Sequence, residues 1–196
     1  MPHVRNAFVP NPINRIPRPP PYPSSESGDH CAVWNNWLEA QGAADEWPPM
    51  IQLSAPTSAD VTVIGASIRV FRSYVPTGLS YIECVHGAGP VPGTLLDVDL
   101  AHPAAAPTIV ADDGSDTPLA LPGAVINVDP GHTEYVAVTA RGARKMYEWS
   151  VTLRVVVAQR TQTLVFGSPH RPLRSWLGAR PTVTYDYDFS ANAWRS

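Results

Sequence analysis

The chain has 196 residues, of which 44% are hydrophobic and 16% are charged; it contains 22 prolines and has a formal net charge of −3. This length suffices for one domain whose core needs no metal or disulfide scaffold. The low charged fraction and the high proline content argue against a coiled coil, a long-helix bundle and a free nucleic-acid binder. The composition favours short strands joined by many turns.

The sequence shows no targeting or membrane signal. No apolar run reaches the ~18 residues of a transmembrane helix, and the N-terminal region contains no apolar stretch of signal-peptide type. We therefore expect a soluble, cytoplasmic protein without a membrane span.

Residues 1–28 are expected to form a proline-rich basic arm or linker. Eight prolines and three arginines, but no acidic residue, fall within residues 1–23. Because proline fixes φ and lacks a backbone donor, this stretch should be extended and should supply neither a helix nor a central strand. Removing its three positive charges from the total of −3 leaves −6 on the remainder, so a basic arm is joined to an acidic body.

Three roles stay open for the arm. It can be a disordered spacer, a strap packed on its own domain or on a sister subunit, or a docking peptide. The last role rests on Pro17-x-x-Pro20 beside Arg18, a pattern that binds aromatic grooves of SH3-like domains. Arg15, Arg18 and Tyr22 are its candidate interaction residues.

A short amphipathic helix is expected at about residues 30–41. Asp29 can serve as its N-cap and Gly42 as its C-terminal stop. One face carries four apolar residues at helical spacing, Val33, Trp34, Trp37 and Leu38. A helix this short is marginal alone, so its stability must come from packing both indoles on something larger. Either the helix closes one end of the domain, or Trp34 and Trp37 form an exposed pair that binds a partner.

Beyond residue 50 the sequence indicates strands and turns. In residues 61–73 the apolar phase slips at Gly65, which indicates a bulge or bend. Residues 147–157 alternate almost without a break and should turn at 158–161 into a second strand at 162–166. The side chains of this first strand expected to face outward are Glu148, Ser150, Thr152 and Arg154. Shorter strands are expected at 51–53, 80–85, 95–100, 124–128, 133–139 and 182–187.

These strands predict an all-β fold for residues 29–196. The expected architecture is an antiparallel two-sheet β-sandwich, immunoglobulin-like or related, with one short N-terminal amphipathic helix and an extended Pro-rich arm. The sequence shows neither strand-helix alternation, which would suggest a parallel sheet, nor an internal repeat.

Two cysteines, each close to a histidine, have three possible states. Cys31 and Cys84 can be free thiols, or they can form a disulfide that would stabilise the fold by about 4 kcal/mol. With His30 and His86 they can also bind zinc, although adjacent residues on a helix start and a strand rarely converge on one tetrahedron. We therefore expect no cofactor.

Other motifs that carry chemistry do not match. The Asp-rich turn at 112–116 lacks the glutamate that an EF-hand needs at position twelve, where Gly123 stands. The glycine-rich stretch 87–93 contains two prolines, which lack the N–H groups that hold phosphate. The common motifs of serine hydrolases and zinc proteases do not occur. The sequence therefore predicts no catalytic residue and no enzyme, while a triad assembled by the fold stays open.

Nucleic-acid binding is not expected, because the acidic body lacks a basic face in aggregate. Arg171, Arg174 and Arg180 do form a local basic stretch around Trp176. We interpret this stretch as a loop that wraps the sandwich, with a binding patch as the alternative.

Several stretches carry a resemblance to known proteins. They are Trp34-x-x-Trp37-Leu38 with Gly42-Ala43, residues 61–70, Asp97-Val-Asp99-Leu100, residues 134–139, Tyr147-x-Trp149 and Trp194. Over most of residues 29–196 the chain resembles uncharacterised actinobacterial β-sandwich proteins, some of them attached to a membrane anchor or a regulatory domain. The resemblance implies no assigned activity and carries over no catalytic residue. The Pro-rich arm stands where anchored relatives have their anchor.

We therefore expect a non-catalytic protein-interaction or accessory module that binds a protein partner or itself. One alternative is a structural subunit of a phage or other particle that uses its N-terminal arm for assembly. A second alternative is a hydrolase with a fold-assembled site.

Overall fold

The structure, a computed structural model, describes residues 6–21, 34–83, 93–110 and 114–196. Strands dominate these residues, accompanied by one short α-helix and one 3-10 helix, so the prediction of an all-β fold is confirmed. None of the helices in the described part of the chain has the length and apolar character that spanning a bilayer requires.

The described strands form three sheets, where two were expected. Sheet I runs in the order β12 (Arg160–Phe166), β11 (Met146–Val157), β4 (Val61–Tyr74) and β9 (Ile126–Val128), and β13 (Leu173–Trp176) also pairs with β11. Sheet II runs in the order β3 (Met50–Ser54), β10 (Thr133–Arg141), β6 (Thr94–Asp99), β7 (Thr108–Val110) and β8 (Asp116–Pro118). Sheet III runs in the order β15 (Ala193–Arg195), β14 (Thr184–Asp188), β5 (Ser80–Ile82), β1 (Ala7–Val9) and β2 (Ala44–Asp45).

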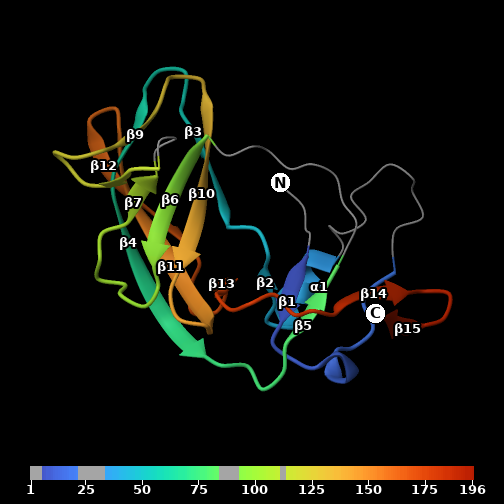
Figure 1. Ribbon diagram of the computed structural model, residues 1–196. Coiled ribbons are helices and arrows are strands. Elements are labelled where there is room, and N and C mark those ends of the chain that lie inside the picture. The colour runs from blue at the N-terminus through green and yellow to red at the C-terminus, as the bar shows by residue number, and fades with distance from the viewer. Residues whose placement is uncertain (1–5, 22–33, 84–92, 111–113) are drawn as a thin grey trace.

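Sheets I and II pack face to face around the main core (Figure 1). From sheet I, Trp149, Val151 and Leu153 point into this core and are fully buried. Val136 and Val138 of β10 meet them from sheet II. Burial of every second residue is what a strand with one face on a core requires, so the alternation in the sequence located this face correctly.

The long pair of β4 and β11 confirms two details of the sequence analysis. The register shifts between Arg154 and Val155, opposite Gly65, where the slip of the apolar phase predicted a bulge. The hairpin from β11 to β12 also forms, with Ala158 and Gln159 at φ angles of 47° and 62° in its turn.

Ser150, which was expected to face outward, lies on the outward face of β11 but is only 5% exposed. It lies in β11, which has neighbouring strands on both sides, and its side chain is too short to reach past them. Ser150 therefore faces away from the main core as expected but is covered by its neighbours, whereas Arg154 on the same face is exposed.

Among the described strands two pairs are parallel, in contrast to the fully antiparallel arrangement that was expected. β6 pairs in parallel with β10, and β5 pairs in parallel with β14. Between β6 and β10 the chain passes through β7 and β8 and then through β9 of sheet I before it returns. Alternation shows which face of a strand is buried but not which strand lies beside it, so the sequence could not reveal these pairings.

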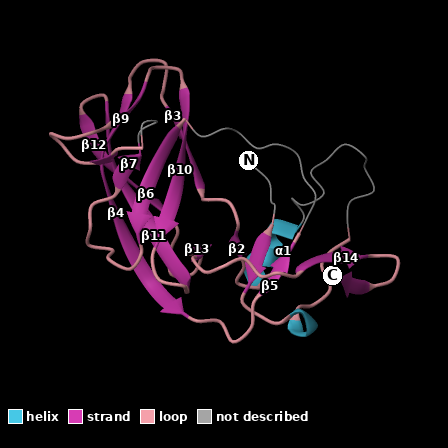
Figure 2. Cartoon of the chain, viewed as in Figure 1, coloured by secondary structure: helices cyan, strands magenta, loops and turns pink. Residues whose placement is uncertain are grey.

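Sheet III lies beside the two larger sheets together with α1 (Asn35–Ala40) and η1 (Ile13–Arg15), as Figure 2 shows. Its own core includes Val9, Leu38 and Ile82. Gly42 ends the helix with a φ of 72°, as predicted. The expected start of the helix, including Asp29, lies outside the described residues.

The N-terminal arm supplies a central strand, contrary to the prediction. β1 lies between β2 and β5, and pairs antiparallel with both. Ala7, Phe8 and Val9 are all buried. No proline occurs between Pro2 and Pro10, so these three residues keep the backbone donors that a central strand needs. The high proline count of the whole arm concealed this short stretch.

A small cluster joins sheet III to sheet I. Phe8, Ala44 and Tyr81 of sheet III pack with Met146 at the start of β11. Because successive side chains of a strand alternate, Met146 lies on the face opposite to Tyr147, which belongs to the main core. Sheet III therefore covers one end of the outer face of sheet I.

Candidate functional site

The candidate interaction residues of the arm and the helix lie in different environments. Arg15 and Arg18 are exposed, whereas Trp34 is fully buried. The indole of Trp34 donates a hydrogen bond of 3.0 Å to the carbonyl oxygen of Pro20, which holds the arm against the helix. Tyr22 lies outside the described residues. An exposed tryptophan pair is therefore not what the structure shows.

Trp37 belongs to a cluster of aromatic rings that packs α1 on sheet III. Its ring centroid lies 5.7 Å from that of Trp34 and 6.2 Å from that of Trp194. Tyr187 extends the cluster, in edge-to-face contact with Trp194 at 5.0 Å. Each such pair contributes about 0.5–1.5 kcal/mol beyond its buried area. The tryptophans expected to contact a partner or close the domain thus stabilise a second core.

The four cysteine and zinc candidates, His30, Cys31, Cys84 and His86, all lie outside the described residues. Among the residues that are described, no group of three or more His, Cys, Asp or Glu side chains is placed to hold a metal ion. The possible states of Cys31 and Cys84 stay predictions.

The basic stretch around Trp176 is neutralised within the chain. Part of it forms β13 and pairs with β11, so it is not simply the loop that was expected. Each arginine of the stretch pairs with a glutamate: Arg171 with Glu39 at 2.8 Å, Arg174 with Glu148 at 3.3 Å, and Arg180 with Glu46 at 3.3 Å. The hydrogen bond that Glu39 accepts from Arg171 is the main cause that lowers the pKa of Glu39. The pairs of Arg171 and Arg180 link the segments that flank β13 to α1 and to the residue after β2, whereas the pair of Arg174 joins β13 to β11 within sheet I.

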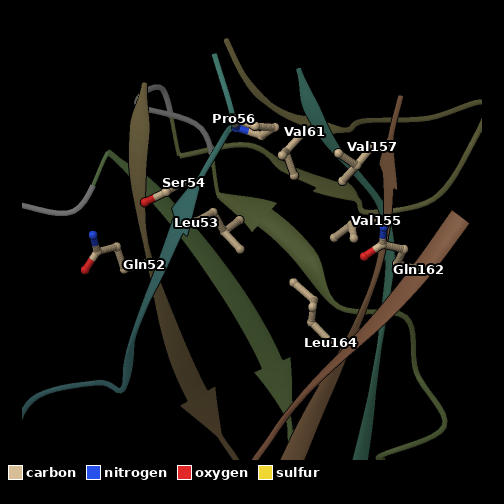
Figure 3. A pocket seen from close by; sticks show the side chains of 9 residues that line it. All are labelled: Gln52, Leu53, Ser54, Pro56, Val61, Val155, Val157, Gln162 and Leu164. Carbon is tan, nitrogen blue, oxygen red and sulfur yellow. The ribbon is translucent and has the colours of Figure 1, made fainter. Parts of the chain in front are cut away.

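A hollow of about 290 Å³ opens between sheets I and II, on the side where β3 and β12 are edge strands (Figure 3). Its lining comes from β3, from the start of β4 and from the hairpin of β11 and β12. The lining residues are Gln52, Leu53, Ser54, Pro56, Val61, Val155, Val157, Gln162 and Leu164.

The lining of the hollow is mostly apolar and carries no ionisable side chain. Leu53, Val61 and Val155 are buried, while the polar groups come from exposed Gln52, Ser54 and Gln162. The hydroxyl of Ser54 lies 3.0 Å from that of Thr133, and no lining residue is a base that could activate it. The hollow thus suits an uncharged apolar group and offers no acid-base pair for hydrolysis.

Both strands beside the hollow have a free edge in the described part of the chain. β3 pairs with β10 alone, and β12 pairs with β11 alone. β12 contains neither proline nor lysine, its one charged residue is Arg160, and its Val165 is 61% exposed. Natural edge strands are usually protected by charge, proline or a covering segment, because their unpaired backbone groups attract further strands. β12 has little of this protection.

The hollow is not predictable from the sequence, although the strands that line it are. The hollow exists because β3 and β12 are edges on the same side of the two sheets. Which strands are edges depends on pairings between distant segments, and alternation carries no information about them. The one available signal was the low charge of residues 160–166.

Comparison of the chain with protein-family models, with curated proteins and with solved structures found no match. The resemblance to actinobacterial β-sandwich proteins therefore stays a prediction from the sequence. What the chain does has to be inferred from its own geometry.

Proposed function

We propose that the protein is a non-catalytic interaction module, built on a sandwich of sheets I and II, that accepts an extended segment of a protein partner at its open side. The observation that carries this proposal is the apolar hollow flanked by the free edges of β3 and β12. A strand added to β12 gains backbone hydrogen bonds, and an apolar side chain of that strand enters the hollow.

The chemistry of the hollow specifies the accepted segment. Its polar lining groups are two side-chain amides and one hydroxyl, so a charged side chain placed there would lose its hydration without gaining a charged partner. The segment should therefore alternate apolar with small polar residues. One buried aliphatic side chain contributes about 1.5–3 kcal/mol and each backbone hydrogen bond about 0.5–1.5 kcal/mol. Association itself costs several kcal/mol, so the expected binding is weak and reversible.

Two alternatives receive less support. A particle subunit would use its arm to reach a neighbour, but residues 7–9 of the arm pair within the chain's own sheet III. A hydrolase would need a nucleophile and a base in the hollow, and its nine lining residues include no histidine or carboxylate.

The proposal is tested by titrating the protein with the peptide Thr-Val-Thr-Leu-Thr-Val-Thr, followed by NMR of the backbone amides. The control peptide has the same composition with its three apolar residues together at one end. We expect shifts at the amides of β3 and β12 with the alternating peptide only. Val157→Phe, which fills the hollow, should abolish them.

The matched control is Thr117→Phe, which adds the same side chain to β8, the edge strand at the other end of sheet II. It should bind the peptide like the parent protein. Shifts on other strands, or shifts that persist after Val157→Phe, would show that the hollow is not the binding site.

A further inference from the structure

Three exposed arginines lie on the outer face of sheet I, the face turned away from the main core. Arg69 and Arg72 belong to β4 and Arg154 belongs to β11. In the register of the two strands Arg69 is paired with Ser150. The adjacent pair, Val151 with Ile68, points into the main core, so Arg69 points to the opposite face. We call Arg69, Arg72 and Arg154 the arginine strip. This surface is separate from the hollow and goes beyond the proposed function.

A second register shift places Arg69 and Arg72, which are three residues apart in β4, on the same face of the sheet. The shift between Glu148 and Trp149 adds one residue to β4 at this point, and a bulge of this kind turns a side chain from its regular direction. The guanidinium carbon of Arg69 lies 5.6 Å from the ring centroid of Phe71, and that of Arg72 lies 4.4 Å from the centroid of Tyr74. A cation held over a ring face keeps its N–H groups at the rim available to a ligand.

Arg154 reaches across from β11 to β4. A Cβ atom added to Gly65 would lie 3.4 Å from Nη2 of Arg154, so the guanidinium group lies over the backbone of this glycine. Gly65 and Arg69 are four residues apart, which is about 13 Å along a strand. Ser67, between them, is exposed. The arginine strip therefore follows β4 for about 20 Å.

The arginine strip lacks the carboxylate partners that other arginines of the chain have. The three arginines of the basic stretch, and also Arg141 and Arg195, each form an ion pair. Within the described ranges no carboxylate forms an ion pair with an arginine of the strip. Glu148 stands opposite Arg72 in the register, but its carboxylate pairs with Arg174. The protein has a negative net charge, yet these three positive charges on its surface form no ion pair within the described residues.

We propose that the arginine strip binds an extended, carboxylate-rich polypeptide segment. Guanidinium groups bind carboxylates through two parallel N–H donors, and side chains on one face of an extended chain repeat every ~7 Å. Carboxylates at positions i, i+4 and i+6 match the spacing of Arg154, Arg69 and Arg72. A nucleic acid fits less well, because three cations neutralise few phosphates and the net charge of −3 repels the rest.

The proposal is tested with the labelled peptide Glu-Ser-Thr-Ser-Glu-Ser-Glu and its Gln counterpart, by fluorescence anisotropy with the full chain at low and at physiological salt. We expect the Glu peptide to bind and the Gln peptide to fail. The double variant Arg69→Gln/Arg154→Gln should weaken binding at least tenfold. The parent affinity should fall as the salt concentration rises.

Arg144→Gln/Arg160→Gln is the matched control, because both residues are exposed arginines outside the strip and the double variant removes the same charge as Arg69→Gln/Arg154→Gln. It should change the affinity less than twofold, and circular dichroism should show that every variant keeps the parent fold. If the control loses as much affinity for the Glu peptide as the double variant of the strip, the loss follows from net charge alone, and the proposal is overturned. Tighter binding of oligothymidylate than of the Glu peptide, lost in the same double variant, would overturn it in favour of a nucleic acid.

Discussion

At the scale of single residues, Trp149 combines apolar burial with a hydrogen bond in the main core. Its side chain is fully buried, and its Nε1 donates to the hydroxyl of Ser175 at 3.1 Å. It thereby joins β11 to β13, which pair along this stretch. The sequence identified Trp149 as a core residue by alternation alone. It could not identify Ser175 as its partner, because the two strands are separated by β12 in the chain.

Replacing Trp149 with alanine should lower the free energy of unfolding by about 3–5 kcal/mol, since a large buried ring is lost. Ser175→Ala should cost about 1–3 kcal/mol, because the indole N–H is then left without its acceptor. Urea unfolding with an unchanged m-value measures both changes. A cost below about 1 kcal/mol for Trp149→Ala would contradict its place in the core.

Asp188 provides a residue-scale prediction on pH. The hydroxyl of Ser190 and the N–H groups of Ser190 and Ala191 donate to it, and Arg195 pairs with it, which together lower the pKa of Asp188 to about 2. Because the folded-state pKa lies below the unfolded value, this carboxylate stabilises the turn above about pH 4 and stops doing so as the pH falls toward 2. NMR titration of the side-chain carboxyl carbon checks the pKa.

In Asp188→Asn the acid-induced change in the amides of β14 and β15 should disappear between pH 4 and 2. Asp116→Asn, at an exposed aspartate of β8, is the control and should leave that change in place.

At the scale of elements, the length of a strand decided whether the sequence could predict it. β4 and β11 are 14 and 12 residues long, so their alternation and even the bulge at Gly65 were visible. β1 has three residues and β2 has two, too few for a period-2 pattern to stand out. Their existence depends on tertiary pairing, which is also why β12 was recognised as a strand but not as an exposed edge.

The central position of β1 leads to a prediction for the arm. Phe8 is 7% exposed and its ring centroid lies 5.1 Å from that of Tyr81. Phe8→Ala should therefore cost about 3–5 kcal/mol. Arg18→Ala, an exposed position of the same arm, should stay within about 0.5 kcal/mol of the parent. Thermal unfolding of the two variants side by side measures the difference, and equal midpoints would mean that the arm does not pack as a strand.

At the scale of the whole molecule, one hydrophobic cluster and a few ion pairs connect the second core to the main core. Sequence periodicity predicted most strands of the main core and also β5 and β14, but not that these two belong to a third sheet, whose strands are spread along the chain. The basic arm and the acidic body that the sequence distinguishes are therefore parts of one fold. Residues 7–16 of the arm contribute directly to the cores around sheet III.

Met146 is the residue that should reveal how strongly the two cores are coupled. It is the first residue of β11, is fully buried and packs against sheet III. Met146→Ala should cost about 2–5 kcal/mol. Hydrogen exchange should accelerate more at the amides of β1 and β5 than at those of β6 and β10, because the first pair loses its support. Equal acceleration in both sheets would show that the molecule opens as a single unit.

The scattered origin of sheet III has a consequence for biosynthesis. Within sheet III β1 is translated before the other strands, its neighbour β5 lies more than seventy residues later in the sequence, and β14 and β15 follow all the strands of the main core. Contacts between such distant segments form late, because the intervening loop has to close first. A nascent chain can therefore pair Ala7 and Phe8 with β2 early, but the other edge of β1 stays open until β5 has been translated, after β3 and β4 and before β6. Until then β1 is a segment that a chaperone has reason to shield.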